Sequence, residues 1–366
     1  MTKTHFYFDE RCFWHGGGNY AQVLPVGGFV QPLVSGGLPE APETKRRLKN
    51  LLEVSGLASH LHMSGAASAT IEDLLRVHPK TYVEEFKRMS DQGGGELGLR
   101  TPFGPGGFEI AALSTGLVKQ AVKSVLEGSA NNAYALSRPP GHHCLPDFPN
   151  GFCLLANIPI AIEAARAEKL VERVAVVDWD VHHGNGTEAI YYDDPNTLTI
   201  SLHQERCYPL DTGSADQTGG KAAPNSNMNI PLPPGGGNDL YLEAMERLVL
   251  PRLRAFKPDL IIVACGYDAA AGDPLSRMMC SSDTFRKMTE MVMAESGGKI
   301  VTAHEGGYSE VYVPFCGHAV LEAMSGDPVH IEDPMLQRIT NQQPNARLAQ
   351  FHSSEIDRLV EYFGIK

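Results

Sequence analysis

Short apolar runs that alternate with helical segments constrain the fold of this chain more than any other feature of its sequence. The runs lie at residues 133–136, 174–177, 198–202, 260–265 and 300–303. A strand that is apolar at nearly every position is buried on both faces, which is typical of a parallel sheet covered by helices. Helical patterns lie between the runs, at 158–167, 239–256 and 282–294. The sequence therefore predicts an α/β fold with a mostly parallel central sheet and helices on both faces.

The two ends of the chain carry weaker patterns. Residues 1–60 are rich in Gly and Pro, and we expect mostly loops and short helices there. Helical spacing appears at 71–77 and in a second stretch that ends at Met89, before a glycine-rich loop at 93–107. A loop of that length in a compact domain is usually functional. We see no repeat or linker, so we expect a single domain over residues 1–366, with a polar helical tail from about 327 to 366.

Composition narrows the classes of partner. The formal net charge of −12 gives the chain no overall electrostatic reason to bind nucleic acid or an anionic membrane. No apolar run reaches the ~18 residues that span a bilayer. The acidic surface could favour cationic substrates, although solubility explains it equally well. The seven cysteines include no C-x-x-C pair, and the chain has no secretory apolar segment, so we expect a reduced, cytoplasmic protein.

Polar residues gather where four of the apolar runs end. Arg-Pro-Pro-Gly-His-His follows the first run, Asp-Trp-Asp-Val-His-His-Gly-Asn-Gly the second, Gly-Tyr-Asp the fourth and His-Glu-Gly-Gly-Tyr the fifth. Ligands of open parallel sheets bind beyond the carboxyl ends of the strands. Four strand ends that deliver His, Asp and Tyr to one rim are hard to explain by packing, so we expect the functional site there.

Asp180 and His182 form the strongest metal signal. Residues i and i+2 of an extended segment point the same way, and Asp268 from another strand end would complete a set of three ligands with open positions. Two carboxylates and one imidazole suit Zn²⁺, while Fe²⁺ and Co²⁺ stay open. An isolated D-x-H is more often a turn, but Asp178 and His183 flank this one before Gly-Asn-Gly. That context favours a catalytic metal site.

Three further residues are candidates for acid–base and oxyanion chemistry. His142 and His143 follow a rigid Pro-Pro-Gly turn and could act as general base and acid. Asp178 and Asn185 are plausible partners to orient them. Tyr308 follows two glycines and could donate a hydrogen bond to an oxyanion opposite the metal. Each feature alone is more often packing or surface, so its weight comes from the neighbouring metal motif.

In this order and spacing, the four motifs resemble those of the histone deacetylase and acetylpolyamine amidohydrolase superfamily. The resemblance covers about residues 42–325, and Asn185 with Ser201-Leu202-His203 is similar to class II enzymes and bacterial histone-deacetylase-like amidohydrolases. It implies a single-domain arginase/deacetylase-like α/β fold with long active-site loops. It also implies a zinc-dependent deacylase that hydrolyses acetyl-lysine-type amides by metal-activated water. The substrate would be an acyl-lysine peptide or a small acylated amine.

The resemblance also implies roles for individual residues. Asp180, His182 and Asp268 would bind zinc. His143 would be the general base beside His142, and Tyr308 would polarise the scissile carbonyl. The acyl-lysine tunnel and its rim would be formed by Gly151, Phe152, Tyr208, Leu275, Gly307 and Glu96. Structural K⁺ would bind at two sites, the first formed by Asp178, Asp180, His182, Ser201 and Leu202, the second by Tyr191, Asp194 and Thr197.

Three rim positions bear on the substrate. Tyr208 stands where a tunnel phenylalanine is usual in the family, which makes the wall more polar. Glu96 is the nearest candidate for the rim aspartate that holds the substrate backbone in relatives. Leu275 stands where polyamine-selective animal relatives carry a glutamate, and a leucine cannot attract the ammonium groups of a polyamine. We therefore expect acyl-lysine substrates to be hydrolysed better than acetylpolyamines.

Three alternatives stand beside zinc-dependent deacylation of acyl-lysine. An acetylpolyamine amidohydrolase would use the same machinery on a different amine. A catalytically silent acyl-lysine binding module would be expected to have lost a metal ligand or the tyrosine, and all are present in this sequence. A binuclear manganese hydrolase of the arginase type shares the fold but needs more bridging aspartates than this rim supplies. The oligomeric state is open, with a homo-oligomer among the alternatives.

Overall fold

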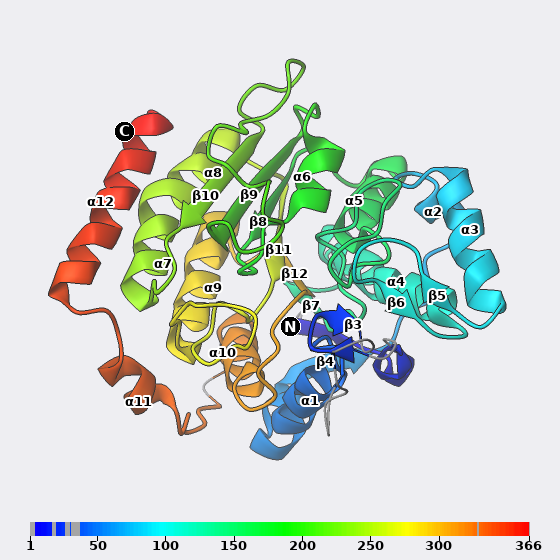
Figure 1. The fold of residues 1–366 in the computed structure, drawn as a ribbon, viewed down its shortest axis with the longest axis horizontal. Coiled ribbons are helices and arrows are strands. Elements are labelled where there is room, and N and C mark those ends of the chain that lie inside the picture. The colour runs from blue at the N-terminus through cyan, green and yellow to red at the C-terminus, as the bar shows by residue number, and fades with distance from the viewer. Residues whose placement is uncertain (1–3, 17–19, 26–29, 31–36, 328, 366) are drawn as a thin grey trace.

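A computed structural model describes residues 4–16, 20–25, 30, 37–327 and 329–365 of the chain (Figure 1). Its main strands are β1 (Thr4–Tyr7), β4 (Leu61–Ser64), β7 (Ala133–Ala135), β8 (Val174–Asp178), β9 (Thr197–Gln204), β10 (Asn227–Leu232), β11 (Leu260–Cys265) and β12 (Ile300–His304). They form one parallel sheet in the order β10-β9-β8-β11-β12-β7-β1-β4. Two short antiparallel pairs lie outside it: β2 (Tyr20–Ala21) with β3 (Leu24–Pro25), and β5 (Gly95–Glu96) with β6 (Pro102–Phe103).

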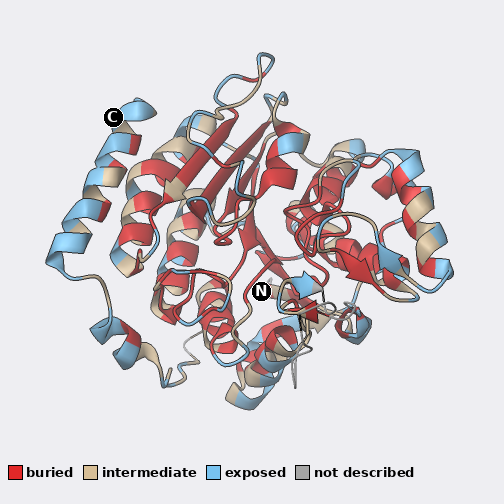
Figure 2. Cartoon of the chain, in the orientation of Figure 1, coloured by how far each residue is buried: buried red, intermediate tan, exposed pale blue. Residues whose placement is uncertain are grey.

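Alternate residues of the central strands enter two separate cores. In β8, Val174 and Val176 pack in the core on one face of the sheet, whereas Ala175 and Val177 pack in the core on the other. The residues of β11 divide between the same two cores. Figure 2 shows that the central strands are buried along their length. Burial on both faces explains why these strands have no polar face in the sequence.

Helices cover both faces of the sheet (Figure 1). One core is completed mainly by α4 (Gly107–Leu126) and α5 (Asn157–Ala167). The other core is completed by α1 (Glu43–Ser55), α7 (Asn238–Ala244), α8 (Leu250–Phe256), α9 (Ser282–Ser296) and α10 (Val313–Ser325). The remaining helices are α2 (Ile71–Leu74), α3 (Lys80–Asp91), α6 (Asn185–Tyr191), α11 (Leu336–Asn341) and α12 (Ala346–Tyr362), with single 3₁₀ turns at Glu10–Trp14 and Leu57–His60.

The α/β fold predicted from the sequence is confirmed. All five predicted strands are present, as are the helices predicted between them. The segment predicted as one helix at 239–256 is continuous, and Met245–Val249 forms a π-helical turn between α7 and α8. The predicted C-terminal tail contains α11 and α12. Ile356 and Leu359 of α12 are buried in the core on the α7 side, so this segment packs on the body of the protein.

The expectation of mostly loops and short helices in residues 1–60 is wrong for much of the segment that the structure describes. β1 lies inside the sheet between β7 and β4, and α1 is a helix of 13 residues. β1 has only four residues, too few to display a period in the sequence. The part of that expectation on residues 1–3, 17–19, 26–29 and 31–36 lies outside the described residues.

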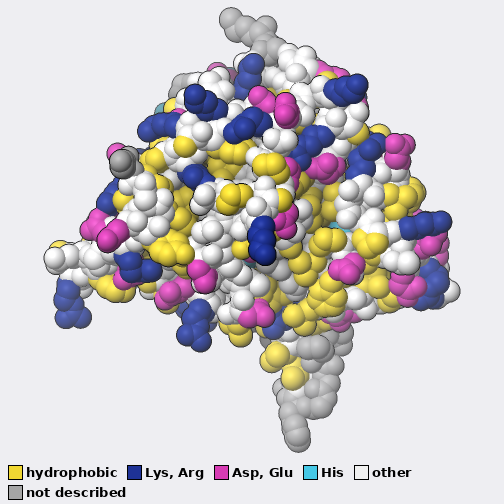
Figure 3. Space-filling model, turned by 90° about the horizontal axis from the view of Figure 1, so that it is seen from above, with side chains coloured by type: hydrophobic (Ala, Val, Ile, Leu, Met, Phe, Trp, Pro, Cys, Tyr) yellow, Lys and Arg dark blue, Asp and Glu magenta, His cyan; other side chains and the backbone are white. Residues whose placement is uncertain are grey.

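The helices of the described residues and one face of the surface bear on the classes of partner. None of the helices in the described ranges is long and apolar enough to cross a membrane. On the face drawn in Figure 3, lysine and arginine side chains are interspersed with aspartate and glutamate.

Candidate metal centre and catalytic pocket

Three donor residues from two strand ends converge beyond the carboxyl edge of the sheet. Just after β8, the side chains of Trp179 and Val181 enter the core, so Asp180 and His182 face the opposite way. His182 Nδ1 lies 3.1 Å from Asp180 Oδ1 and 3.0 Å from Asp268 Oδ2. One donor atom from each of these three residues lies within 4.8 Å of the other two, and all three residues are buried.

Backbone donors hold the two carboxylates in place. Asp268 Oδ1 accepts a hydrogen bond from the N–H of Val181 at 2.8 Å, and Asp180 Oδ2 accepts one from the N–H of Gly306 at 2.8 Å. A Cβ atom at residue 306 would lie 2.3 Å from Asp268 Oδ2 and 2.6 Å from Asp180 Oδ2. Glycine is therefore required there, because any side chain would fill the space beside the carboxylates.

The charges of this cluster fit a divalent cation. Burial and the Asp180 carboxylate raise the pKa of Asp268 to about 6. Burial disfavours the charged form of His182, but the Asp268 carboxylate outweighs it, so the pKa of His182 is raised well above its usual value. A divalent cation would compensate both carboxylates and bind the imidazole in its neutral form. Two oxygen donors and one nitrogen donor, with positions left open, suit Zn²⁺, Fe²⁺ or Co²⁺.

His142 and His143 each have a side-chain partner on Nδ1. His142 Nδ1 lies 3.0 Å from Asp178 Oδ2, and His143 Nδ1 lies 2.8 Å from Asn185 Oδ1. Because both partners are acceptors, each Nδ1 carries a proton and donates it, and the Nε2 atoms remain for chemistry. His142 Nε2 lies 3.8 Å from Asp180 Oδ1. The tandem histidines are therefore oriented by fixed partners beside the metal cluster.

The two histidines differ in charge. Burial alone would lower the pKa of His142, but the carboxylates of Asp180 and Asp178 outweigh it and raise the pKa to about 10. Burial, together with His142 and His182, lowers the pKa of His143 well below its usual value. The surroundings therefore favour the charged form of His142 and the neutral form of His143. Groups whose pKa values are pushed apart in this way are typical of acid–base sites.

Glu305 supports the loop that carries the tandem histidines, a role that the sequence analysis did not assign. Its Oε2 accepts hydrogen bonds from the N–H of Gly141 at 2.7 Å and from the N–H of His142 at 3.1 Å. The side chain is fully buried, and burial raises its pKa to about 7. Its place inside the His-Glu-Gly-Gly-Tyr motif was the only signal that the sequence offered.

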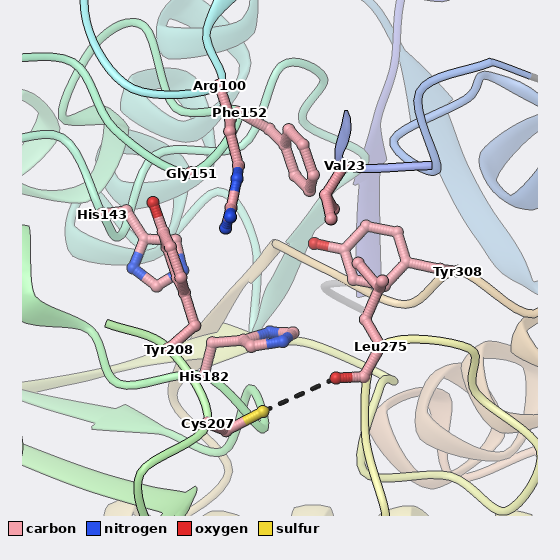
Figure 4. Close-up of a pocket in the computed structure, with 10 residues that line it drawn as sticks. All are labelled: Val23, Arg100, His143, Gly151, Phe152, His182, Cys207, Tyr208, Leu275 and Tyr308. Atoms are coloured by element: carbon pink, nitrogen blue, oxygen red, sulfur yellow. Dashed lines mark hydrogen bonds between the residues drawn. The ribbon is translucent and has the colours of Figure 1, made fainter. Parts of the chain in front are cut away.

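A pocket leads to His143, His182 and Tyr308. Its volume of about 150 Å³ is below the roughly 300–1,000 Å³ of pockets for drug-sized ligands, so it suits a single extended side chain. A Cβ atom at Gly151 would lie 2.5 Å from His143 Cδ2 and 2.8 Å from Tyr208 Cε1, so glycine keeps this wall open. The lining residues are Val23, Arg100, His143, Gly151, Phe152, His182, Cys207, Tyr208, Leu275 and Tyr308 (Figure 4).

Most residues expected in the tunnel lie at this pocket. Its walls include four of them: Gly151, Phe152, Tyr208 and Leu275. Gly307 directly precedes Tyr308 and has a φ of +116°, a conformation that favours glycine. Val23 and Cys207 also line the pocket, and the sequence analysis did not single them out.

Glu96 lies on the glycine-rich loop, and both of its carboxylate oxygens accept hydrogen bonds. Its Oε2 accepts a hydrogen bond from the Tyr20 hydroxyl at 2.7 Å, and its Oε1 accepts one from the N–H of Thr101 at 3.1 Å. The carboxylate therefore joins the glycine-rich loop to the N-terminal segment, and the side chain stays exposed. From the same loop, Arg100 lines the pocket.

The residues expected at the first K⁺ site lie together. Asp178 and Ser201 are register partners on β8 and β9, and Leu202 follows on β9. Asp180 and His182 come directly after β8, and Asp178 Oδ1 accepts from the N–H of Asp180 at 3.0 Å. The set is therefore contiguous with the metal cluster.

The residues expected at the second K⁺ site have their side-chain oxygens engaged. The carboxylate of Asp194 accepts from Arg166 Nη1 at 2.7 Å, and the hydroxyl of Thr197 accepts from Arg166 Nη2 at 2.8 Å. The hydroxyl of Tyr191 donates to Glu163 at 3.1 Å. A cation at this turn would therefore be bound by backbone carbonyls.

Comparisons with known proteins cover both the sheet and the pocket. The family model for the histone deacetylase domain matches residues 38–324. A histone deacetylase-like amidohydrolase of Pseudomonas aeruginosa is 55% identical, over 100% of this chain and 97% of that protein. Histone deacetylase 8 of Arabidopsis thaliana is 34% identical, over 81% of this chain and 82% of that protein. Among solved structures, the HDA15 HD domain matches with a TM-score of 0.84 and 30% identity, over 99% of this chain and 97% of that one.

Proposed function

This chain belongs to the histone deacetylase family of hydrolases, and from that premise we propose that it is a zinc-dependent deacylase of acetyl-lysine-type amides. The observation that carries the proposal is the convergence of Asp180, His182 and Asp268 at a pocket that His143 and Tyr308 also line. His182 belongs both to the metal cluster and to the pocket wall. An acylated side chain in the pocket would therefore reach metal, base and phenol together.

Each side chain has a separate part in the proposed reaction. A bound zinc ion would supply Lewis-acid activation of water and of the scissile carbonyl. His143, whose Nδ1 proton is held by Asn185, accepts a proton from the attacking water at Nε2. Tyr308 donates its hydroxyl to the carbonyl oxygen as negative charge develops there. His142, whose Nδ1 is held by Asp178, acts in its protonated form and supplies the proton for the departing amine.

The proposed substrate is an acyl-lysine side chain. Phe152 and Tyr208 give the pocket aromatic walls that suit the aliphatic stem of lysine. Leu275 is half-buried in an apolar cluster with Phe152 and Tyr308 and offers no charge to a polyamine. An acetylpolyamine amidohydrolase, the second candidate, would use the same catalytic residues and differ in the amine that it releases.

We also propose that the protein binds K⁺ and that it is located in the cytoplasm. Structural K⁺ would bind at the two sets of residues around Ser201 and Asp194. The cytoplasm is the proposed location, and it is supported by the free state of all seven cysteines, since disulfides are rare in reducing compartments.

A substrate panel tests this function. We would measure kcat/KM on an acetyl-lysine peptide, acetylputrescine and acetylspermidine, for the wild type and for Leu275→Glu. We expect the wild type to prefer the peptide and the variant to shift towards the polyamines. A wild-type preference for acetylpolyamines of about tenfold or more would favour the second candidate, since one well-placed contact can supply that discrimination. If the metal-loaded protein hydrolyses none of the substrates, the silent binding module replaces both.

A further inference from the structure

Arg100 gives the pocket a positive charge that the proposed reaction does not use. The residue is half-buried and lines the pocket with the catalytic side chains. Its carbonyl oxygen accepts a hydrogen bond from the N–H of Phe152 at 2.9 Å, and its φ is +58°. This backbone conformation is uncommon for a residue other than glycine, and the hydrogen bond from Phe152 ties it to the pocket wall. The backbone of Arg100 therefore places its side chain at the pocket. Figure 4 shows the guanidinium pointing into the space between Tyr208 and Phe152.

The guanidinium has an aromatic neighbour but no anionic partner in the described part of the chain. Its carbon lies 5.2 Å from the centre of the Tyr208 ring, within the range of a cation–π contact. No carboxylate of a described residue lies within the 4.0 Å of an ion pair. Glu96, the acidic residue on the same loop, uses both oxygens for Tyr20 and Thr101. The guanidinium of Arg100 is therefore available to pair with an anionic group of a ligand that enters the pocket.

The surroundings make this charge selective for a carboxylate. The neighbouring walls include one apolar cluster, in which Phe152 is buried and Val23 and Leu275 are half-buried. A guanidinium that loses part of its water against such walls gains most from an ionised oxygen ligand. Its planar fork matches the two oxygens of a carboxylate, which gives a shorter and stronger hydrogen-bonded pair than a neutral acceptor does.

We propose that Arg100 forms a subsite for a carboxylate of the substrate. The inference rests on the proposed function for the identity of the acyl-lysine chain in the pocket. The carboxylate could stand on the amine side, as the α-carboxylate of a free acyl-lysine, or on the acyl side, as the distal carboxylate of a dicarboxylic acyl group. Either source would bind the same guanidinium, whereas the ammonium groups of a polyamine would be repelled by it.

Matched pairs of substrates distinguish the two sources. The first pair is Nε-acetyl-lysine with a free α-carboxylate against its α-carboxamide. The second pair is an Nε-succinyl-lysine peptide against the Nε-butyryl-lysine peptide of the same sequence. We would measure kcat/KM for each pair with the metal-loaded wild type, Arg100→Gln and Arg206→Gln. Arg206 is exposed, lies outside the pocket lining and carries the same charge, so its variant controls for the loss of one positive charge.

In at least one of the two pairs, we expect the wild type to have a kcat/KM at least about fivefold higher for the anionic substrate than for its neutral partner. One charge-assisted hydrogen bond at a partly exposed site has an effect of about this size. The preference should disappear in Arg100→Gln, persist in Arg206→Gln and weaken with added salt, because salt screens the pairing. Equal rates within both wild-type pairs would overturn the proposal. A preference that survives in Arg100→Gln would overturn it as well.

A binding measurement separates this inference from the proposed function. Methyl ketone analogues of acetyl-lysine, in which CH₂ replaces the amide N–H, cannot be hydrolysed and are prepared as the α-carboxylate and as the α-carboxamide. Calorimetry with the same three proteins then reports the amine-side preference without turnover. A preference that depends on Arg100 in a protein that hydrolyses nothing would contradict the proposed function and support the subsite. If the protein hydrolyses its substrates but neither the kinetic nor the binding measurement depends on Arg100, the proposed function would be supported and the subsite would be contradicted.

Discussion

The backbone N–H of Tyr308 donates to Asp273 Oδ2 at 2.8 Å, so a buried carboxyl holds the tyrosine at the pocket. Asp273 Oδ1 also accepts from the N–H of Leu275 at 2.8 Å, which fixes a second part of the wall. The hydrogen bond to Asp273 Oδ2 involves the backbone of Tyr308 and not its side-chain hydroxyl. A Cβ atom at Gly306 would lie 3.0 Å from the Tyr308 hydroxyl and 2.3 Å from Asp268 Oδ2, so the hydroxyl lies close to the metal cluster.

Tyr308→Phe should therefore remove the hydroxyl and little else. We expect kcat to fall by about 10²–10³, the effect of losing one donor to an oxyanion. The metal content should stay as in the wild type, because Tyr308 is not one of the three donor residues of the cluster. Steady-state kinetics with metal analysis on the same preparations measures both quantities.

Tyr208→Phe is the matched control, since it also removes one phenol from the pocket. Its hydroxyl donates to Asn150 and not towards the metal cluster. We expect a loss in kcat below about tenfold, in line with one neutral hydrogen bond. Equal losses in the two variants, or normal turnover in Tyr308→Phe, would remove Tyr308 from the chemistry.

A buried charge cluster supports the segment before the tandem histidines. Glu40 Oε1 lies 3.0 Å from Arg138 Nε and 3.1 Å from Lys45 Nζ, and all three side chains are buried. Burial alone would raise the pKa of Glu40, but the two cations outweigh it and lower the pKa to about 2. Glu40→Gln leaves the two cations without their anion and should lower the free energy of unfolding by about 3–5 kcal/mol. Urea denaturation measures the change.

Glu43→Gln is the control for that variant, because Glu43 forms an exposed ion pair with Arg46 on the same helix. The control should lose less than about 1 kcal/mol. If Glu40→Gln is no less stable than the control, the cluster does not stabilise the fold as described.

His78 should make stability depend on pH. Its Nδ1 donates to the carbonyl of Pro146 at 2.7 Å and its Nε2 accepts from the N–H of Ala156 at 3.0 Å, so the folded protein holds the ring neutral. Burial lowers its pKa from 6.5 to about 4. The unfolded chain therefore binds this proton first as pH falls. The stabilisation is complete above pH 6.5 and declines towards pH 4, by about 3 kcal/mol in total.

His78→Gln removes that titration and keeps one donor and one acceptor. The free energy of unfolding, measured in urea at several values between pH 7 and pH 4, should fall less steeply in the variant than in the wild type. The other buried histidines are common to both proteins and cancel in the comparison. Parallel curves would show that His78 does not contribute.

The sequence predicted the strands that are apolar at nearly every position. β8 and β11 are apolar at nearly every position because both faces of the sheet are covered, and each was predicted together with the polar residues at its end. The resemblance to the histone deacetylase superfamily, read from four motifs, is confirmed by the family match over residues 38–324.

Elements that follow another rule were missed. Most residues of α4 are buried, so it lacks the polar face that marks an amphipathic helix in a sequence. β10 carries Asn227 and Asn229 at buried positions, and both amides donate to Glu188 Oε2 at 2.7 Å. Asparagine and proline are depleted in strands, so the alternation of Asn227, Asn229 and Pro231 with apolar residues was not recognised as a strand.

The candidate site divides in the same way. The strand ends predicted which residues would meet, because parallel strands deliver their ends to one edge. No comparable rule predicts which side chains of the glycine-rich loop reach the pocket. The loop conformation, including the positive φ of Arg100, brings Arg100 and not Glu96 into the pocket lining, and the role of Glu96 towards the substrate backbone stays a prediction.

The zinc content of purified Asp268→Asn and Asp273→Asn tests the central claim most directly. Both residues are buried acids in the segment after β11, but only Asp268 belongs to the cluster with Asp180 and His182. We predict about one equivalent of zinc in the wild type and in Asp273→Asn, and much less in Asp268→Asn together with loss of hydrolysis. A wild-type zinc content in Asp268→Asn, or full hydrolysis by metal-free wild type, would contradict the account.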